Sequence, residues 1–290
     1  MAVSYGLHIA VVIGCLSLFA WGCDGGGADR ASGSRRTPLA LPSGYRVVDV
    51  VNGGTLSGSV LWIGPSPEVV SVPVEHHREA CGTTQNVPVL TLGARGGVAG
   101  TVVYLDGITE GRALETGRFE VAFRACSLTP RVLAMPLGST LSVLDDEEVL
   151  HNLHGAWLHG TSGGSASWLD VGLPSRGAHG SAVADHTGVA TLLDDAGHPW
   201  IGGFVHVFDH PYYGVTGDDG RFRITGIPPG QYTVRAWHEG VRRARDGTDA
   251  SGRPHFSAPL VLARPISVTS GTDTGVDFQL DLAAVDAAGD

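Results

Sequence analysis

Residues 192–211 read LLDDAGHPWIGGFVHVFDHP, and this stretch decides the fold of the chain. A short apolar run ends in Asp194, a tight loop with Gly197 carries His198, and the alternating segment 204–208 follows at once. Alternation of this kind is typical of a β-strand with one buried face. The stretch therefore predicts two neighbouring strands joined by a loop that holds one histidine.

Composition extends the β prediction to the whole chain. The 290 residues include 43 glycines and 16 prolines, and no long apolar stripe with helical periodicity is visible. Frequent turn residues between short apolar runs favour an all-β fold. The length is sufficient for two domains of ordinary size.

The charge balance limits the possible partners. The chain has no lysine, so its 19 basic residues are all arginine, and its 29 acidic residues leave a net charge of −10. A protein that binds nucleic acid must neutralise a run of phosphates with basic side chains. We therefore expect no nucleic-acid partner.

The N-terminal segment predicts export. Residues 1–22 form a short apolar run that ends in small residues, as in a secretory signal peptide. Cys23 follows directly, which resembles the lipobox of bacterial lipoproteins, although Cys15 closes an earlier rival box. The resemblance implies lipidation at Cys23, a membrane anchor and a periplasmic or outer-membrane location. Residues 23–44 are rich in Gly, Ser and Arg and predict a flexible tether.

Two cysteines remain for the folded part of the chain, Cys81 and Cys126. In an oxidising compartment such a pair predicts a disulfide. Closing a loop of this length would stabilise the fold by up to about 4 kcal/mol.

Short strands are expected along most of the remaining sequence. We expect irregular structure over 157–168, an acidic loop over 145–154 and a loop over 242–253. The expected strands lie near 54–64, 99–105, 119–125, 131–136, 139–144, 179–185, 188–193, 204–208, 214–224, 227–237 and 266–280.

The late segments VTGDDGRFRITGIPPGQYTVRAW (215–237) and ISVTSGTDTGVDFQL (266–280) resemble the carboxypeptidase-regulatory-like, or transthyretin-like, β-sandwich. The two strands that open this family are missing just before Val215, but GTLSGSVLWIG and GGVAGTVVYLDG supply them much earlier. We therefore predict a sandwich split between 45–110 and 211–282, a second domain inserted at 111–210, and a tail over 283–290. Three modules in series are the alternative.

The inserted part resembles the cupredoxins, as found in bacterial lipoproteins of the plastocyanin-like and methylamine-utilisation type. The matching features are the acidic loop before His151, the loop with His198 and the strand that follows it. A blue-copper site of this family needs two histidines, a thiolate and a weak axial methionine. Here Asp194 stands at the thiolate position and Ile201 at the methionine position.

Two functions from different classes follow from these residues. The first is an exported, lipid-anchored, non-enzymatic envelope protein that binds or scaffolds an unidentified protein or carbohydrate partner, with no cofactor at its degenerate copper loop. The second is a copper-binding or electron-transfer protein that uses His151, Asp194 and His198 as metal ligands. Two imidazoles and a carboxylate suit Cu(II), Zn(II) or Fe(II) better than a blue-copper centre.

Other histidines are further candidates for chemistry. His154 and His159 are possible substitute ligands, and His76-His77 between Glu75 and Glu79 is a second possible metal cluster. We expect His206, His210 and the pair His238-Glu239 to be surface or hydrogen-bonded groups. No His-Glu-x-x-His helix or phosphate-binding glycine loop occurs. The one Gly-x-Ser-x-Gly match, GTSGG at 160–164, lies in a Gly- and Ser-rich segment without the strand-to-helix context of a nucleophile elbow, so we expect no enzyme activity.

Overall fold

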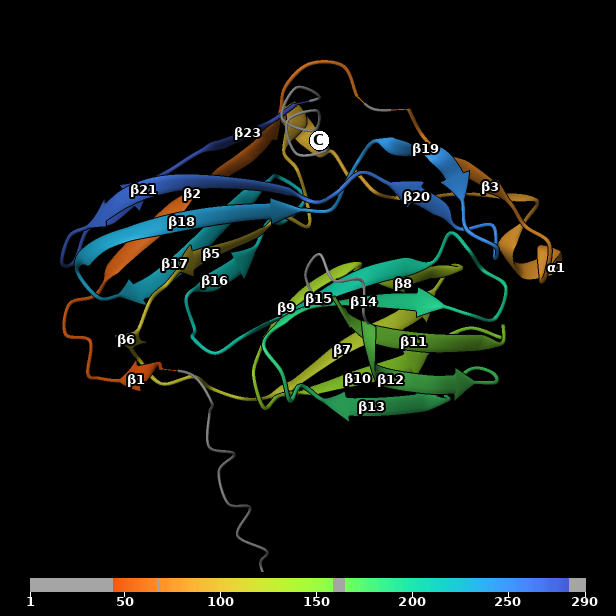
Figure 1. Cartoon of the computed structure of the whole chain (residues 1–290), viewed down its shortest axis with the longest axis horizontal. Helices are drawn as coiled ribbons and strands as arrows, with labels where there is room; N and C mark the ends of the chain where they lie inside the picture. Colours follow the sequence, from red (N-terminus) through yellow and green to blue (C-terminus); the bar gives the residue numbers. More distant parts are fainter. Residues whose placement is uncertain (1–43, 67, 159–164, 282–290) are drawn as a thin grey trace, which may run out of the picture. The chain divides into compact units, whose positions relative to one another are not determined.

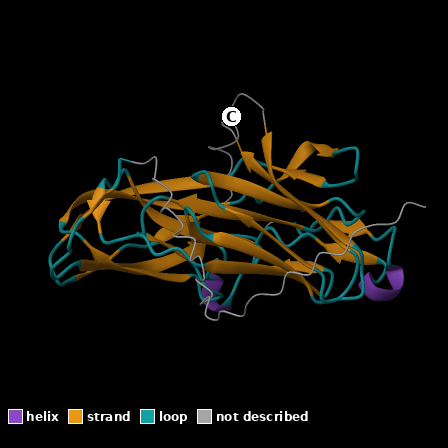
Figure 2. Ribbon diagram, turned by 90° about the horizontal axis from the view of Figure 1, so that it is seen from below, coloured by secondary structure: helices purple, strands orange, loops and turns teal. Residues whose placement is uncertain are grey.

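The structure, a computed structural model, describes residues 44–66, 68–158 and 165–281. Strands make up nearly all of the regular secondary structure of this part (Figure 2), and its helices are the single turn α1 (Arg78–Cys81) and the 3₁₀ turn η1 (Ala94–Gly96). The predicted all-β class is therefore confirmed. None of the described helices has the length and hydropathy that a membrane span needs.

Several predictions concern residues outside the described ranges and stay predictions. They are the signal peptide over 1–22, lipidation at Cys23, nearly all of the tether over 23–44, His159 as a substitute ligand and the tail over 283–290.

Strands from two distant parts of the sequence pair to form one β-sandwich, called here the split sandwich. In Figure 1 the early orange strand β2 accordingly lies among late strands drawn in blue. One sheet has the order β16 (Tyr213–Val215), β5 (Val102–Asp106), β18 (Gly230–His238) and β21 (Leu260–Val268). The other has the order β17 (Arg221–Ile227), β2 (Gly54–Trp62) and β22 (Asp273–Gly275), and β23 (Phe278–Leu280) also pairs with β2.

The strands between these two parts form the inner sandwich. Its first sheet has the order β13 (His179–Val183), β10 (Thr140–Asp145), β7 (Arg118–Arg124) and β8 (Ser127–Thr129). Its second sheet has the order β12 (Ser165–Leu173), β11 (His151–Leu158), β14 (Gly188–Asp194), β15 (Gly202–Phe208) and β9 (Val132–Pro136). A nested arrangement requires that the early and late strands pair around the inner sandwich, as they do here. The exact domain boundaries stay a prediction.

Each sandwich encloses its own apolar core, and a third cluster joins them. Val102 and Trp237 of the split sandwich contact Val132 and Ala134 of the inner sandwich, with aromatic side chains around them. The outer faces of two sheets are therefore buried against each other. As a result, strands at this contact have both faces covered, as β15 does.

Three small ribbons complete the fold: β1 (Arg46–Val47) with β6 (Glu110–Gly111), β3 (Ser71–Pro73) with β4 (Thr84–Asn86), and β19 (Arg243–Thr248) with β20 (Pro254–Phe256). The expected loop over 242–253 was therefore too long: residues 243–248 form a strand, because a two-stranded ribbon needs no apolar alternation to form, and only 249–253 connect the two strands.

Two other expected irregular segments, 157–168 and the acidic loop 145–154, were predicted to be longer than they are in the structure. Strand β11 begins at His151 and pairs with β12 through Leu158. The side chain of Trp157 points into the core and packs against Trp168, with ring centroids 4.9 Å apart.

Candidate metal centre

The strand register brings His151 and Asp194 together. Strands β11 and β14 are antiparallel neighbours, and Leu153 lies opposite Asp194. Side chains alternate between the two faces of a strand. His151 therefore shares the inward face of Leu153, and Asp194 shares that of Leu192, so both polar side chains enter the core at one end of the sandwich.

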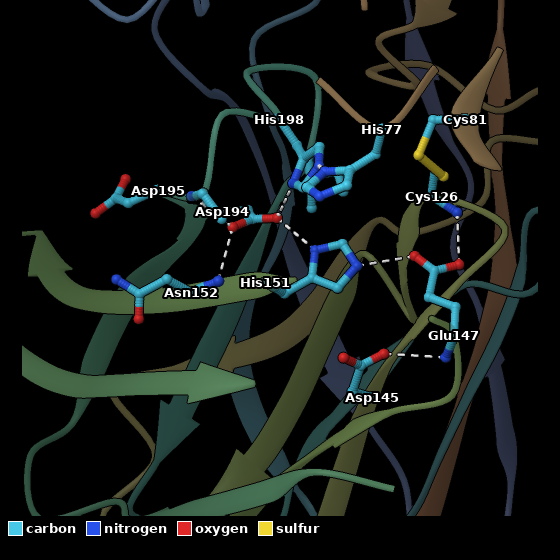
Figure 3. Close-up of polar contacts among 12 residues, drawn as sticks. His77, Cys81, Cys126, Asp145, Glu147, His151, Asn152, Asp194, Asp195 and His198 are labelled. Atoms are coloured by element: carbon cyan, nitrogen blue, oxygen red, sulfur yellow. Dashed lines mark hydrogen bonds and ion pairs between the residues drawn. A yellow bond between two sulfur atoms is a disulfide. The ribbon is translucent and has the colours of Figure 1, made fainter. Parts of the chain in front are cut away.

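His198 reaches the same point from the loop between β14 and β15. Gly197 has a φ of +91°, a conformation that side chains rarely adopt, and this turn aims the following histidine inward. Nδ1 of His198 lies 2.7 Å from Oδ2 of Asp194, and Nδ1 of His151 lies 2.6 Å from the same oxygen. Figure 3 shows both rings directed at this carboxylate.

The three side chains form a compact group of potential metal ligands. Their ligand atoms all lie within 4.8 Å of one another. His151 and His198 are 0% exposed and Asp194 is 1% exposed, so the group is closed to solvent. Asp195, the next residue, is half-exposed, as alternation on a strand requires.

Backbone donors hold the Asp194 carboxylate in its charged form. Its Oδ1 accepts hydrogen bonds from the N–H groups of Asn152 at 3.0 Å and Ala196 at 2.9 Å. Burial raises the pKa of Asp194, but hydrogen bonds from the two histidines and these N–H groups outweigh it and hold the pKa well below its usual range. The site therefore contains a buried anion, which a histidinium or a metal cation can compensate.

Glu147 supports His151 from the opposite side of the ring. Its Oε1 lies 2.9 Å from Nε2 of His151, while its Oε2 accepts a hydrogen bond from the N–H of Cys126 at 2.9 Å. Burial opposes protonation of His151, but the hydrogen bonds and charges of Asp194 and Glu147 raise its pKa above the ordinary value. Phe123 stacks on the His151 ring, with centroids 3.8 Å apart.

A third histidine contacts the group from outside the inner sandwich. Nδ1 of His77 lies 3.1 Å from Nε2 of His198. The sequence predicted a separate metal cluster of His76 and His77 with Glu75 and Glu79. The fold brings His77 to His198 instead, while His76, Glu75 and Glu79 are exposed.

Arg253 fixes the loop that carries His198. Its guanidinium donates to the backbone carbonyls of Asp194 at 2.9 Å and Ile201 at 2.7 Å, the two ends of the loop. A cavity of about 330 Å³ lies beside this loop, and Trp200, Phe256 and Arg253 are among its lining residues.

The donor set at the group contains nitrogen and oxygen but no sulfur. Cys81 and Cys126 form the predicted disulfide. Ile201 is buried, and its N–H donates to the carbonyl of His198 at 2.9 Å. Met135 pairs with Val207, at the far end of β15 from the site. The residues present thus fit Cu(II) or Zn(II) rather than a copper–thiolate centre.

The remaining candidate histidines lie elsewhere. His154 is partly exposed and lies 3.4 Å from the carboxylate of Asp195. His206, His210 and the pair His238-Glu239 are all buried. They are buried because the two sandwiches pack together there, and Glu239 is paired with Arg131. The expectation of a surface or hydrogen-bonded group was wrong for His206, whose Nε2 has no partner among the described residues. His210 accepts a hydrogen bond from the N–H of Tyr212, and His238 donates to the carbonyl of Glu239, so for these the expectation of a hydrogen-bonded group holds.

Sequence reasoning found the three central residues and missed Glu147, Arg253 and the role of His77. Glu147 precedes His151 by four residues in the acidic loop, so its position was a usable signal. Arg253 and His77 come from distant segments, and no local pattern connects them with the loop.

The fold and this cluster define an all-β protein of two sandwiches with a candidate metal centre. Residues 189–281 match the family model described as the carboxypeptidase regulatory-like domain. The match begins in β14 of the inner sandwich and continues through the late strands of the split sandwich. No curated protein matches the chain.

Solved cupredoxins are similar in structure to about a third of the chain. A purple cupredoxin from Nitrosopumilus maritimus has a TM-score of 0.26 and 22% identity, over 31% of this chain and 98% of that one. A Cu(I) variant of amicyanin has a TM-score of 0.27 and 21% identity, over 31% and 82%. The Cu-containing nitrite reductase from Thermus scotoductus SA-01 has a TM-score of 0.26 and 17% identity, over 34% and 24%. Both resemblances expected from the sequence are thus found.

Proposed function

We propose that this protein holds a divalent metal ion, with copper favoured, through His151, Asp194 and His198. The observation that carries the proposal is the convergence of two imidazole nitrogens on one buried carboxylate oxygen. Among divalent first-row metals, Cu(II) generally binds sites of nitrogen and oxygen ligands most tightly. A bound metal would supply a buried positive charge opposite the Asp194 carboxylate.

The surroundings of His151 support this proposal. A histidine that binds metal through one ring nitrogen usually donates its other N–H to a carboxylate or carbonyl. Glu147 lies at this distance from Nε2 of His151, so the ring can present Nδ1 as a ligand. We further propose that copper–thiolate chemistry has been lost with the sulfur ligands, since Asp194 and Ile201 occupy their places.

We also propose a non-enzymatic role in the bacterial cell envelope. The side chains of the closed group are buried, which favours storage or structural binding over catalysis. The sequence supports export, lipidation at Cys23 and anchoring in the periplasm or outer membrane. In that case the protein would bind its partner, an unidentified protein or carbohydrate, through the outer surface of the two sandwiches.

One observation favours a second candidate function, that of a metal-free scaffold. Both oxygens of Asp194 accept hydrogen bonds from within the protein, so the carboxylate is satisfied without a metal. In this case the former copper loop would serve packing alone, and the protein would act only through its partners.

Metal content decides between these two functions. The full mature protein would be purified from its own envelope, analysed for metals and titrated with Cu(II) and Zn(II). We expect one equivalent of metal and, with Cu(II), an electron paramagnetic resonance spectrum with nitrogen splittings. Asp194→Asn should weaken binding, whereas His186→Ala, at a distant exposed histidine, should not. Absence of metal from both the isolated and the titrated protein would favour the scaffold.

A further inference from the structure

The metal centre is closed by a segment that does not belong to the inner sandwich. This segment, residues 74–83, is called here the clasp and contains α1. A hydrogen bond from the N–H of Val74 to the carbonyl of Thr83, at 3.0 Å, joins its two ends. Arg78 donates from Nε to the carbonyl of Val74 at 2.7 Å and makes the turn more compact.

The clasp presents His77 to the centre through a backbone conformation that few residues adopt. His77 precedes α1 with a φ of 57° and a ψ of 38°, in the left-handed region. From this position Nδ1 of its ring reaches Nε2 of His198 at 3.1 Å (Figure 3). The two rings are tilted by 36°, with centroids 5.3 Å apart.

This contact determines which nitrogen of His198 is free for a metal. Nδ1 of His198 faces Asp194, so it can bind a metal only as the unprotonated nitrogen of a neutral ring. The ring proton must then be on Nε2, and a buried N–H requires an acceptor. Nδ1 of His77 lies within hydrogen-bond distance to accept it.

We propose that His77 is a further residue of the metal site, which positions His198 by accepting its Nε2–H and closes the centre as part of the clasp. This inference rests on the metal-binding function proposed above. His77 is a positioning residue and not a ligand, because its ring lies on the side of His198 away from Asp194.

The disulfide ties this residue to the support of the other histidine. Cys81 is the last residue of α1, which follows His77 directly, and it is bonded to Cys126. The N–H of Cys126 in turn donates to Glu147, the outer partner of His151. The disulfide therefore connects the segment that carries His77 to Cys126, the hydrogen-bond partner of Glu147. It keeps the clasp against the centre.

Two substitutions at His77 separate the role of the ring from the strain of the backbone. His77→Gly removes the ring at a position whose positive φ suits glycine. His77→Asn places an amide oxygen near the position of Nδ1, and asparagine also tolerates this conformation. His186→Ala removes an exposed imidazole away from the loop that carries His198 and is the matched control.

The experiment measures Cu(II) affinity by competition, Cu(II) release to an excess of chelator, and the paramagnetic spectrum of the full mature protein. We expect His77→Gly to lower affinity by about 10- to 100-fold, as for other outer partners of metal ligands, and to speed release. His77→Asn should restore most of the affinity and of the slow release, and His186→Ala should match the wild type. Thermal unfolding of each variant establishes that it is folded.

The failures of the two proposals are distinguishable. If the wild type binds metal but His77→Gly has the same affinity, release rate and spectrum, the role of His77 is wrong and the metal site stands. The role of His77 is also wrong if His77→Asn binds metal as weakly as His77→Gly. If the wild type binds no metal at all, the proposed function itself is wrong, and this inference falls with it.

Discussion

Arg131 and Glu239 form a two-pronged ion pair that joins the inner sandwich to the split sandwich. Nε lies 2.7 Å from Oε1 and Nη2 lies 2.7 Å from Oε2. The side chains are only 19% and 7% exposed. Nη1 of Arg131 also donates to the carbonyl of Gly202 at 2.6 Å, directly after the loop that carries His198. The pair thus connects the packing of the sandwiches with the position of the metal loop.

Removing one partner of this pair should be costly. Arg131→Met would leave Glu239 buried and unpaired, which typically destabilises a protein by about 3–5 kcal/mol. Urea unfolding measures the effect. Arg223→Met is the control, because its pair with Asp273 is exposed by 58% and 44% and should contribute less than about 1 kcal/mol. Equal losses in the two variants would contradict the buried role of Arg131.

Asp194→Cys should create a copper–thiolate site. The substitution would give two imidazoles and one thiolate, the set on which blue-copper centres depend. We expect an intense visible absorption band with Cu(II) that the wild type lacks. Asp195→Cys is the control, because the side chain of Asp195 is 48% exposed and lies outside the group. A band of equal intensity from both variants, or from neither, would count against a shared coordination position.

Glu147→Gln should weaken metal binding without removing a ligand. The neutral amide offers one oxygen, which cannot serve both His151 and the N–H of Cys126. We expect a loss of affinity of at least about 10-fold, measured by competition with a chelator. Glu148→Gln is the matched control, since the side chain of Glu148 is 71% exposed. Unchanged affinity in Glu147→Gln would mean that His151 needs no outer partner.

Breaking the disulfide should affect stability and metal release together. Cys81 and Cys126 are separated by 45 residues, so the double Ser variant should lose up to about 4 kcal/mol of unfolding free energy. Release of bound metal should become faster, because the clasp loses its covalent attachment. Urea unfolding and chelator challenge measure the two effects. Release at the wild-type rate would show that the clasp stays closed without the bond.

His206 should make stability depend on pH. Burial lowers its pKa to about 3, against about 6.5 in the unfolded chain. The unfolded state therefore binds the proton first as the pH falls, and stability present above pH 6.5 is lost toward pH 3. At pH 5 the loss is about 2 kcal/mol, from 1.36 kcal/mol per pH unit.

His206→Phe isolates this contribution. The Nε2 atom of His206 has no hydrogen-bond partner among the described residues, and the ring packs edge-on against Trp237 at 4.3 Å. Phenylalanine keeps the packing and removes the titration. The difference in unfolding free energy between variant and wild type should grow by about 2 kcal/mol from pH 7.5 to pH 5. A constant difference would mean that His206 is hydrated in solution.

The sequence was sufficient to predict that Asp194 and His198 share one site, because both residues lie at strand ends. Asp194 closes an alternating run and His198 follows within a tight turn, so strand geometry alone directs both toward one edge. The disulfide was predictable as well, because only two cysteines remained after the N-terminal segment that predicts export. These inferences needed local periodicity, the resemblance to the cupredoxins and a count of cysteines.

What the sequence left open depends on contacts between distant segments. The polar character of His206 and Glu239 suggested exposure, but the stacking of two sheets buries them, and a single strand does not reveal which sheets stack. Likewise, His77 reaches His198 across 121 positions of sequence. Only the packing of the whole fold places such residues.

Strand β15 belongs to two interiors at once, since Val205 and Val207 enter the inner core while Phe204 and His206 meet Trp237. This double burial makes the inner sandwich a poor candidate for transplantation. A fragment cut at its edges would expose a row of aromatic rings to water and should self-associate. Moving this unit into another protein would therefore need a host surface that covers the outer face of β15.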